Sequence, residues 1–188
     1  EFSDQGSLLE SVNRWVPSPN ADDRPDEEVS LIVLHAISLP PGQFGGGAIE
    51  ALFTNQLDAS AHPYFAAIAS LKVSAHFLIR RDGECVQFVE TKRRAWHAGR
   101  SRWWDARGEK WRQALNDFSI GIELEGDDET PFTQAQYITL ASLVDDLLAN
   151  YPQLDFSRIT SHARVAPLRK SDPGPAFDWA YFFQCLDD

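Results

Sequence analysis

The stretch that decides the fold is Ser30-Leu31-Ile32-Val33-Leu34-His35. It is a short, continuous and partly β-branched apolar run after a polar segment that contains proline, and such runs are typical of central strands buried on both faces. His35 ends the run, and Pro40-Pro41-Gly42 and Gly45-Gly46-Gly47 then require a loop. We therefore expect rigid backbone to hold the His35 side chain where a buried strand gives way to a loop, a common position for functional sites.

Two other segments have the alternation of strands. Residues 72–80 alternate apolar with polar side chains, and Asp82-Gly83, a type I′ turn signal, precedes another strand-like run, so this region predicts a β-hairpin. Residues 118–125 alternate again, with aliphatic side chains on one face. That alternation directs the carboxylates of Glu123 and Glu125 to the same side of the strand.

Helical signals account for much of the remaining chain. Thr133 and Gln136 form a capping-box pattern ahead of apolar residues at helical spacing, and Asp178 can cap a final helix. We expect helices over residues 48–53, from Thr133 to Tyr151-Pro152, and over residues 179–186. Residues 100–115, which are rich in tryptophan, are expected to be irregular. The sequence therefore predicts an α/β (mixed α+β) fold with a central mixed β-sheet flanked by helices.

The length and the charge limit the class of protein. A chain of 188 residues buries about 70% of its unfolded surface, so we interpret residues 1–188 as a single domain, with about 1–14 as a tag remnant or flexible N-terminus. The formal charge is −11, and basic residues occur as small clusters such as Lys92-Arg93-Arg94, so we expect no nucleic-acid partner. No apolar run approaches the length of a membrane span, so no membrane association is expected.

The cysteines and the first residues bear on the compartment. Cys85 and Cys185 lack metal-site spacing and are too few for a disulfide framework, so we interpret them as independent buried thiols. No basic and apolar leader opens the chain, which favours the cytoplasm. Removal of a leader or tag stays an open alternative, because the chain begins at Glu1 and contains no methionine.

Two histidines and one aspartate are candidate metal ligands. His35 and His162 each end a short extended run, and Asp172 opens Asp172-Pro173-Gly174-Pro175, with Lys170 two residues before it. Two imidazoles and one carboxylate form a ligand set that zinc accepts, and three protein ligands leave a coordination position for water. Such a set is typical of a hydrolase site rather than of a structural clip. The following proline favours extended geometry, so that Lys170 and Asp172 point roughly the same way.

Hydrolysis of an amide also requires a proton shuttle to the departing amine and a charge that stabilises the tetrahedral oxyanion. Glu123 and Lys170 are available for these two roles. A glutamate on a strand face is more often a solvated carboxylate, and the alternation does not distinguish Glu123 from Glu125.

The remaining histidines and the tryptophans have plainer interpretations. His76 and His97 are more often satisfied in a core or at a surface than bound to a metal, and His62 lies in a segment that looks like a loop. The tryptophans of residues 100–115 can line a cleft for sugar or peptide, but aromatic side chains more often only pack.

Motifs spread from about residue 15 to residue 182 resemble one family. They are Pro17-Ser18-Pro19-Asn20, His35-Ala36-Ile37-Ser38-Leu39-Pro40-Pro41-Gly42, Val73-Ser74-Ala75-His76, Ala95-Trp96-His97-Ala98-Gly99, Asn116 to Gly126, and Ala166-Pro167-Leu168-Arg169-Lys170-Ser171-Asp172-Pro173-Gly174-Pro175. With these motifs the chain resembles the AmpD family of bacterial 1,6-anhydro-N-acetylmuramyl-L-alanine amidases, which are related to T7-lysozyme-type amidases and peptidoglycan recognition proteins.

The resemblance implies a T7 lysozyme/peptidoglycan recognition protein-like amidase fold and one zinc ion. The implied zinc ligands are His35, His162 and Asp172. The implied catalytic residues are Glu123 as acid/base, in preference to Glu125, and Lys170 as stabiliser of the transition state. The residues implied to lie near the muropeptide substrate are Lys72, Trp96, His97 and Arg169.

The implied reaction is hydrolysis of the amide between the lactyl group of N-acetylmuramic acid, in its 1,6-anhydro form, and L-alanine of the stem peptide. The implied setting is peptidoglycan recycling by a monomer in the bacterial cytoplasm, with control of β-lactamase induction as a consequence. Two alternatives stay open at this point. They are an envelope amidase that acts on intact murein and a non-catalytic peptidoglycan-binding module.

Two features depart from the family pattern. Ala36 stands where the family usually has asparagine, so we expect one polar contact to the substrate or to a ligand to be absent. Residues 100–115 look longer than usual and lack an obvious counterpart of a substrate-contacting arginine, for which Arg107 and Arg112 are the candidates. Both departures bear on substrate affinity more than on catalysis.

Overall fold

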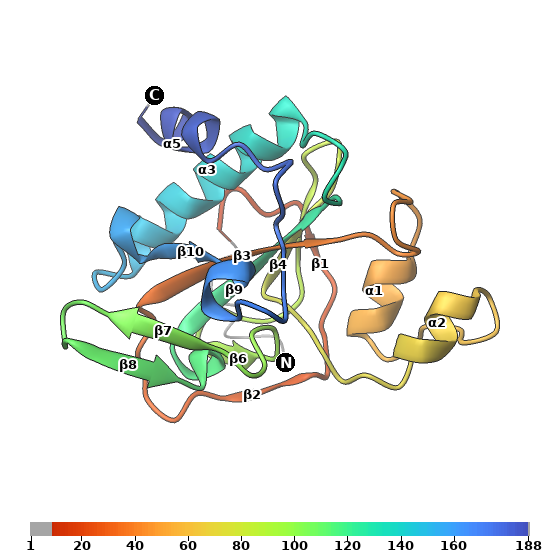
Figure 1. Ribbon diagram of the computed structural model, residues 1–188, viewed down its shortest axis with the longest axis horizontal. Helices are drawn as coiled ribbons and strands as arrows, with labels where there is room; N and C mark the ends of the chain where they lie inside the picture. The colour runs from red at the N-terminus through yellow and green to blue at the C-terminus, as the bar shows by residue number, and fades with distance from the viewer. Residues whose placement is uncertain (1–8, 188) are drawn as a thin grey trace, which may run out of the picture.

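The computed structural model describes residues 9–187, and a mixed β-sheet runs through its centre (Figure 1). From one edge to the other the strands are β1 (Arg14–Trp15), β5 (Cys85–Gln87), β4 (Phe77–Ile79), β9 (Ser119–Glu125), β3 (Leu31–Ile37) and β10 (Ile159–Ser161). Strands β4 and β5 pair antiparallel, and the other neighbours in this sheet are parallel. The predicted central mixed sheet is therefore confirmed.

The two strands that the sequence predicts most clearly are neighbours in the middle of the sheet. Residues 31–34 of β3 are completely buried, as expected for a strand covered on both faces. The parallel register of β3 and β9 aligns His35 with Glu123. Because adjacent strands lie about 4.8 Å apart and aligned residues point to the same face, the two side chains lie together.

The helices cover both faces of the sheet (Figure 1). They are α1 (Ala48–Phe53), α2 (Pro63–Ile68), α3 (Gln134–Asn150), α4 (His162–Val165) and α5 (Trp179–Asp187), with short 3-10 turns at Leu115–Asp117 and Phe156–Arg158. Thr133 and Gln136 form the predicted capping box of α3, and Asp178 Oδ1 accepts a bond from Tyr181 N at 2.9 Å at the start of α5. The three predicted helices are confirmed.

Alternation along the strands sends side chains to different cores. Ile32 and Leu34 of β3 pack in the largest hydrophobic cluster, together with residues of β9, α3 and α5. Leu31 and Val33 point to the opposite face and pack in a separate cluster. A third cluster on that second face lies under α1. His35 therefore projects from the face that α3 does not cover.

The predicted hairpin exists, but its first strand and its turn differ from the prediction. Strand β4 begins at Phe77, because Ser74 N bonds to Trp96 O at 3.1 Å instead of joining β5. The turn is not type I′, which needs two positive φ angles. Gly83 has a φ of +90°, Asp82 has no positive φ, and Gly83 N bonds to Arg80 O at 2.9 Å. A turn followed by one left-handed glycine joins the strands instead.

The prediction of an irregular segment at residues 100–115 is wrong. Strands β7 (Arg102–Asp105) and β8 (Lys110–Gln113) form an antiparallel hairpin that projects beside the sheet (Figure 1). Trp104 lies opposite Trp111 with the rings edge to face at 5.6 Å, and such aromatic pairs across strands stabilise hairpins. A second small pair, β2 (Ala21–Asp23) with β6 (Arg93–Ala95), lies near the hairpin.

The N-terminal stretch lies partly outside the described residues. Residues 1–8 of the expected tag remnant or flexible N-terminus fall there. From residue 9 onward the chain packs on the molecule, because Leu9 and Val12 contact the largest hydrophobic cluster and Arg14 enters β1.

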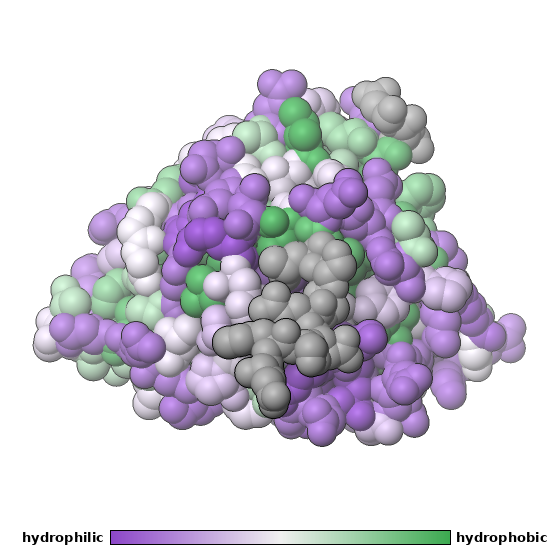
Figure 2. All heavy atoms as spheres, turned by 180° about the vertical axis from the view of Figure 1, so that it is seen from behind, coloured by the Kyte–Doolittle hydropathy of each residue, from purple (hydrophilic) through white to green (hydrophobic). Residues whose placement is uncertain are grey.

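Hydrophilic residues cover much of the visible surface. Figure 2 shows them spread over the face opposite to the view of Figure 1, with hydrophobic residues in small separate groups between them. None of the helices among residues 9–187 has the length and apolar character needed to cross a membrane.

Candidate active site

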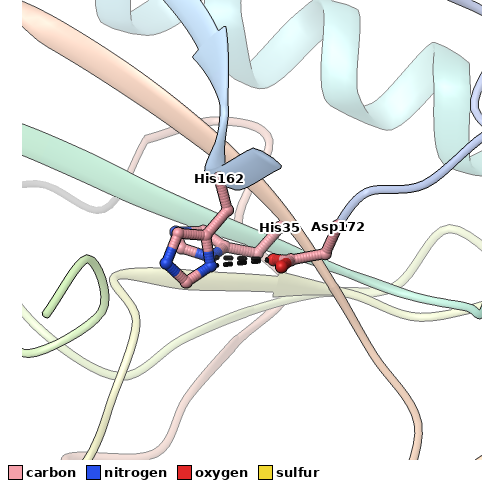
Figure 3. Close-up of side chains that lie close together, drawn as sticks. All are labelled: His35, His162 and Asp172. Atoms are coloured by element: carbon pink, nitrogen blue, oxygen red, sulfur yellow. Dashed lines mark hydrogen bonds and ion pairs between the residues drawn. The ribbon is translucent and has the colours of Figure 1, made fainter. Parts of the chain in front are cut away.

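Three segments distant in sequence bring two imidazoles and one carboxylate together (Figure 3). His35 lies on β3, His162 is the first residue of α4 directly after β10, and Asp172 lies in the loop before α5. His35 Nδ1 lies 3.0 Å from His162 Nδ1 and 3.2 Å from Asp172 Oδ2, and His162 Nδ1 lies 3.1 Å from the same oxygen. The three residues selected from the sequence therefore converge on one point.

The donor atoms of this cluster fit a small divalent ion. Burial lowers the pKa of His35 to about 4, so its imidazole is neutral at pH 7 and can offer a lone pair. Burial alone would raise the pKa of Asp172, but bonds with His162 and His35 outweigh it and hold that pKa below its usual value. A tetrahedral zinc site separates neighbouring ligand atoms by about 3.3–3.4 Å, close to the separations found here.

Glu123 lies beside this cluster and has unused bonding capacity. Its Oε1 atom is 4.0 Å from His35 Nδ1, and no residue in the described part of the chain bonds to its buried Oε2 atom. Burial, followed by the negative charge of Asp172, raises the pKa of Glu123 well above its usual value, whereas the charge of Lys170 opposes the rise. A carboxyl group with a raised pKa is a candidate for proton transfer in a reaction.

Glu125 points to the same side of β9 but is fully engaged elsewhere. Its carboxylate accepts bonds from Gly45 N at 2.5 Å and Arg81 N at 3.3 Å and lies 3.6 Å from Arg80 Nη1. It anchors the loop after β3. The two carboxylates that alternation could not distinguish therefore differ in their bonding, and only Glu123 lines the cavity described next.

A cavity of about 720 Å³ opens over the cluster. His35, His162 and Asp172 are among its lining residues, with Glu123 and Lys170. Its walls also include Ala36, Trp96, His97, Arg169 and the acidic residues 127–129. Lys72 is exposed and is not among the lining residues, although both its neighbours, Leu71 and Val73, are.

The side chains of two wall residues are held by bonds to the protein. Trp96 Nε1 donates to Asp22 Oδ1 at 3.1 Å, which leaves the face of the indole free for contact. Arg169 Nη2 donates to Ala98 O at 3.2 Å and to Arg100 O at 2.7 Å. Arg169 therefore ties the loop after β6 to the loop that carries Asp172.

Other residues weighed from the sequence lie outside this cavity. His76 is completely buried, with one ring nitrogen bonded to Gly121 N and the other to Arg93 O, both at 3.0 Å, so it is a satisfied core histidine. His62 caps α2 by accepting a bond from Tyr64 N. The tryptophans of the β7–β8 hairpin do not line the cavity.

The two arginines considered as replacements for a substrate-contacting residue are paired with carboxylates. Arg107 Nη2 lies 2.5 Å from Asp155 Oδ2, and Arg112 Nη1 lies 2.6 Å from Glu28 Oε1. Neither lines the cavity.

Ser119, which was not singled out from the sequence, contacts His97 beside the cluster. Its Oγ atom is 3.0 Å from His97 Nε2. The sequence contains a signal for this position. Ser119 and Glu123 are an even number of residues apart on β9, so both side chains project to the same face of the sheet.

Comparison with known proteins shows which family the chain resembles over most of its length. A family profile described as N-acetylmuramoyl-L-alanine amidase matches residues 25–175. The 1,6-anhydro-N-acetylmuramyl-L-alanine amidase AmpD of Citrobacter freundii is 56% identical over 180 residues, which cover 95% of this chain and 91% of that protein. AmpD of Escherichia coli K12 is 54% identical over 180 residues, 95% of this chain and 93% of that protein.

Solved structures point the same way. The crystal structure of a selenomethionine derivative of AmpD has a TM-score of 0.89 at 52% identity, over 99% of each chain. A complex of AmiD from E. coli with the substrate anhydro-N-acetylmuramic acid-L-Ala-D-γ-Glu-L-Lys has a TM-score of 0.60 at 28% identity, over 84% of this chain and 57% of that one. Because the family profile spans most of the sequence and these relatives are more than half identical along nearly all of it, the chain belongs to the N-acetylmuramoyl-L-alanine amidase family.

Proposed function

We propose that the chain is a zinc-dependent amidase that hydrolyses the bond between the lactyl group of 1,6-anhydro-N-acetylmuramic acid and L-alanine of the stem peptide, in peptidoglycan recycling. The observation that carries the proposal is the cluster of buried His35 and His162 with half-buried Asp172, which lines a cavity of about 720 Å³. That volume lies in the range of about 300–1,000 Å³ found for small-molecule sites. The AmpD relatives, named for this amide, support the choice of bond.

The two imidazoles and the Asp172 carboxylate would hold the ion. They are the nitrogen and oxygen donors of open zinc sites, and three protein ligands leave room for water. A zinc ion held there would supply Lewis acidity toward the lactyl carbonyl and the attacking water. Burial of His35 favours its neutral form, which is the form that binds metal.

Glu123 moves the proton in the proposed reaction. Its ionised carboxylate takes a proton from the attacking water, and the resulting carboxyl group passes that proton to the departing amine of L-alanine. The raised pKa of Glu123 supports this role, because it makes the carboxylate a stronger base toward the attacking water. Lys170 lies on the cavity wall, where its ammonium group stabilises the negative charge that develops on the carbonyl oxygen.

The cavity walls suggest how the muropeptide is held. Trp96 offers an indole face for the apolar parts of the sugar or peptide. Arg169 on the wall, and Lys72, which is exposed between two lining residues, provide local positive charge for peptide carboxylates, which a protein of net charge −11 would otherwise repel. His97 completes this group of proposed substrate neighbours. Ala36 also lines the cavity, and its methyl group offers no polar contact to a substrate.

The proposed setting follows from the resemblance and not from the site. A recycling amidase acts on soluble muropeptides, so we propose a cytoplasmic, monomeric enzyme whose turnover limits β-lactamase induction. Size-exclusion chromatography coupled to light scattering tests whether the protein is a monomer in solution.

A product assay tests the reaction. Zinc-loaded protein is incubated with 1,6-anhydro-N-acetylmuramyl-tripeptide, and mass spectrometry should detect free stem peptide and the anhydro sugar. The variant His35→Ala should release neither product. If the zinc-loaded wild type leaves the substrate intact, the proposed reaction is wrong.

A second assay separates recycling from action on intact murein. The same enzyme is given isolated sacculi and soluble anhydro-muropeptides at equal stem-peptide concentration. We expect turnover on the soluble substrate to be much faster. Equal or faster release from sacculi would favour the envelope amidase instead.

A further inference from the structure

His35 of the metal cluster and two polar side chains behind it form one connected series of contacts. His35 Nε2, the ring nitrogen that faces away from Asp172, lies 2.9 Å from His97 Nδ1. His97 Nε2 lies 3.0 Å from Ser119 Oγ. Ser119 Oγ donates to Leu115 O at 2.6 Å. This series links the first candidate ligand to a backbone carbonyl.

The carbonyl group of Leu115, at the end of this series of contacts, fixes the direction of every hydrogen bond in the series. A carbonyl oxygen only accepts, so the single hydroxyl proton of Ser119 points to Leu115 O. Ser119 Oγ must then accept from His97, which places a proton on His97 Nε2. A neutral His97 has a bare Nδ1 atom, and it must accept a proton from His35 Nε2. His35 Nδ1 is thereby left with a lone pair.

The surroundings keep His97 neutral. Its ring lies against the imidazoles of His35 and His76, with ring centroids 5.0 and 5.9 Å apart, and no carboxylate of residues 9–187 pairs with it. The guanidinium group of Arg24 lies 3.3 Å from His76 Nε2 and makes another positive charge in this region unfavourable. A second proton on His97 would sit on Nδ1 and would reverse the hydrogen bond with His35 Nε2.

The position of the His97 ring is built into the fold. A Cβ atom at Gly121 of β9 would lie 2.4 Å from His97 Cγ, so the ring needs glycine beneath it. Asn116 Oδ1 accepts from the backbone nitrogens of His97 and Ala98, at 3.2 and 2.8 Å. The ring therefore has one place and one orientation beside His35.

We propose that His97 and Ser119 are positioning residues that fix His35 as the tautomer protonated on Nε2, so that its Nδ1 lone pair faces His162 and Asp172 for metal binding. The inference rests on the zinc site of the proposed function. In metal sites the partner of the second ring nitrogen commonly sets the tautomer in this way. His162 has no such partner among residues 9–187, because its buried Nε2 atom bonds to none of them. Of the two histidine ligands, His35 is therefore the one whose tautomer is set by a protein partner.

Zinc affinity measures this role separately from catalysis. Metal-free wild type and variants are titrated with Zn²⁺ in competition with a chromophoric chelator. We expect His97→Phe to bind zinc about 10–100-fold more weakly, because removal of an outer-shell partner has effects of this size. Ser119→Ala should weaken binding in the same direction. His97→Gln, whose amide can accept from His35 and donate to Ser119, should restore most of the affinity.

A matched control removes a buried hydroxyl outside the series of contacts. Thr160 lies on β10 next to β3, and its Oγ1 atom bonds to none of the described residues. Thr160→Val should bind zinc as the wild type does. Circular dichroism of each metal-free variant checks that it is folded.

A direct observation of the tautomer decides the matter even if His97→Phe does not fold. Long-range ¹H–¹⁵N spectra of the metal-free wild type should show the His35 proton on Nε2. A proton on Nδ1, or unchanged zinc affinity of folded His97→Phe, would overturn the inference while leaving the proposed function intact. Failure of the wild type to bind zinc would instead overturn the proposed function, on which the inference rests.

Discussion

Gly121→Ala should destabilise the protein, although alanine normally suits a strand better than glycine. Gly121 lies in the interior of β9, directly under the His97 ring. The added Cβ atom would lie 2.4 Å from His97 Cγ, 2.6 Å from Nδ1 and 2.8 Å from Cδ2. Since non-bonded carbon atoms prefer about 3.5 Å, the ring must retreat by about 1 Å.

Two opposing effects set the size of the change. Overpacking of this kind costs about 1–3 kcal/mol of folding free energy. Replacing glycine by alanine in a strand interior contributes about 0.5–1 kcal/mol in the other direction. We therefore expect the free energy of unfolding to fall by about 0.5–2 kcal/mol, since the overpacking cost is the larger. The 2.9 Å contact of His97 with His35 should also lengthen, which lowers zinc affinity.

Urea unfolding of the metal-free protein, followed by circular dichroism, measures the first effect. Gly108→Ala is the matched control, because its nearest neighbour would be the flexible Lys110 side chain, with Cε at 3.3 Å. The control should change the free energy of unfolding by less than about 0.5 kcal/mol. If Gly121→Ala is as stable as the control and binds zinc normally, the His97 ring is not held tightly against Gly121.

Three further predictions concern catalysis, the pH dependence of stability, and the half-buried guanidinium group of Arg24. Glu123→Gln should lower turnover by about 10²–10⁴-fold while Zn²⁺ still binds. Steady-state kinetics and a metal titration measure the two effects, and near-normal turnover would show that Glu123 is not the acid/base. Burial holds the pKa of His76 at about 3, below its unfolded value, so its contribution to stability is complete above about pH 6.5 and is lost as the pH falls toward 3. The free energy of unfolding of the metal-free protein, measured with urea, should therefore fall between pH 6 and pH 5. Its slope against pH should be smaller in His76→Gln than in the wild type by up to about 1.4 kcal/mol per pH unit, and equal slopes would contradict this. Half-buried Arg24 donates to four backbone carbonyls, so Arg24→Met should lower the free energy of unfolding by about 3 kcal/mol or more. A loss below about 1 kcal/mol would show that water satisfies those carbonyls.

Local signals account for the elements that the sequence predicted well. The β-branched run of β3 and the alternation of β9 depend only on neighbouring residues, and so do the capping box at Thr133 and the cap at Asp178. Each signal reports a requirement that the backbone must satisfy wherever the element lies. The convergence of His35, His162 and Asp172 was expected from their residue types and from family resemblance, not from any local pattern.

Features that depend on pairing over long distances were not available from the sequence. The β7–β8 hairpin carries tryptophan and arginine on both faces, so it has no apolar alternation, and its stabilising Trp104–Trp111 contact forms only once the strands are paired. Ser119 became notable only when His97, from a different segment, was found against it. Side-chain parity predicts a face, but it does not predict which partner from elsewhere in the chain covers that face.

The geometry of the site is therefore a consequence of the core on the other side of the sheet. Ile122 and Leu124 of β9 pack in the cluster that contains α3, and their burial selects the register of β9 against β3. A slip of one residue would turn those side chains away from α3 and would carry Glu123 to the wrong face, away from His35. The hydrophobic packing under α3 thus aligns the proton-transfer group with the metal ligand, although that packing lies on the face of the sheet opposite to the cavity.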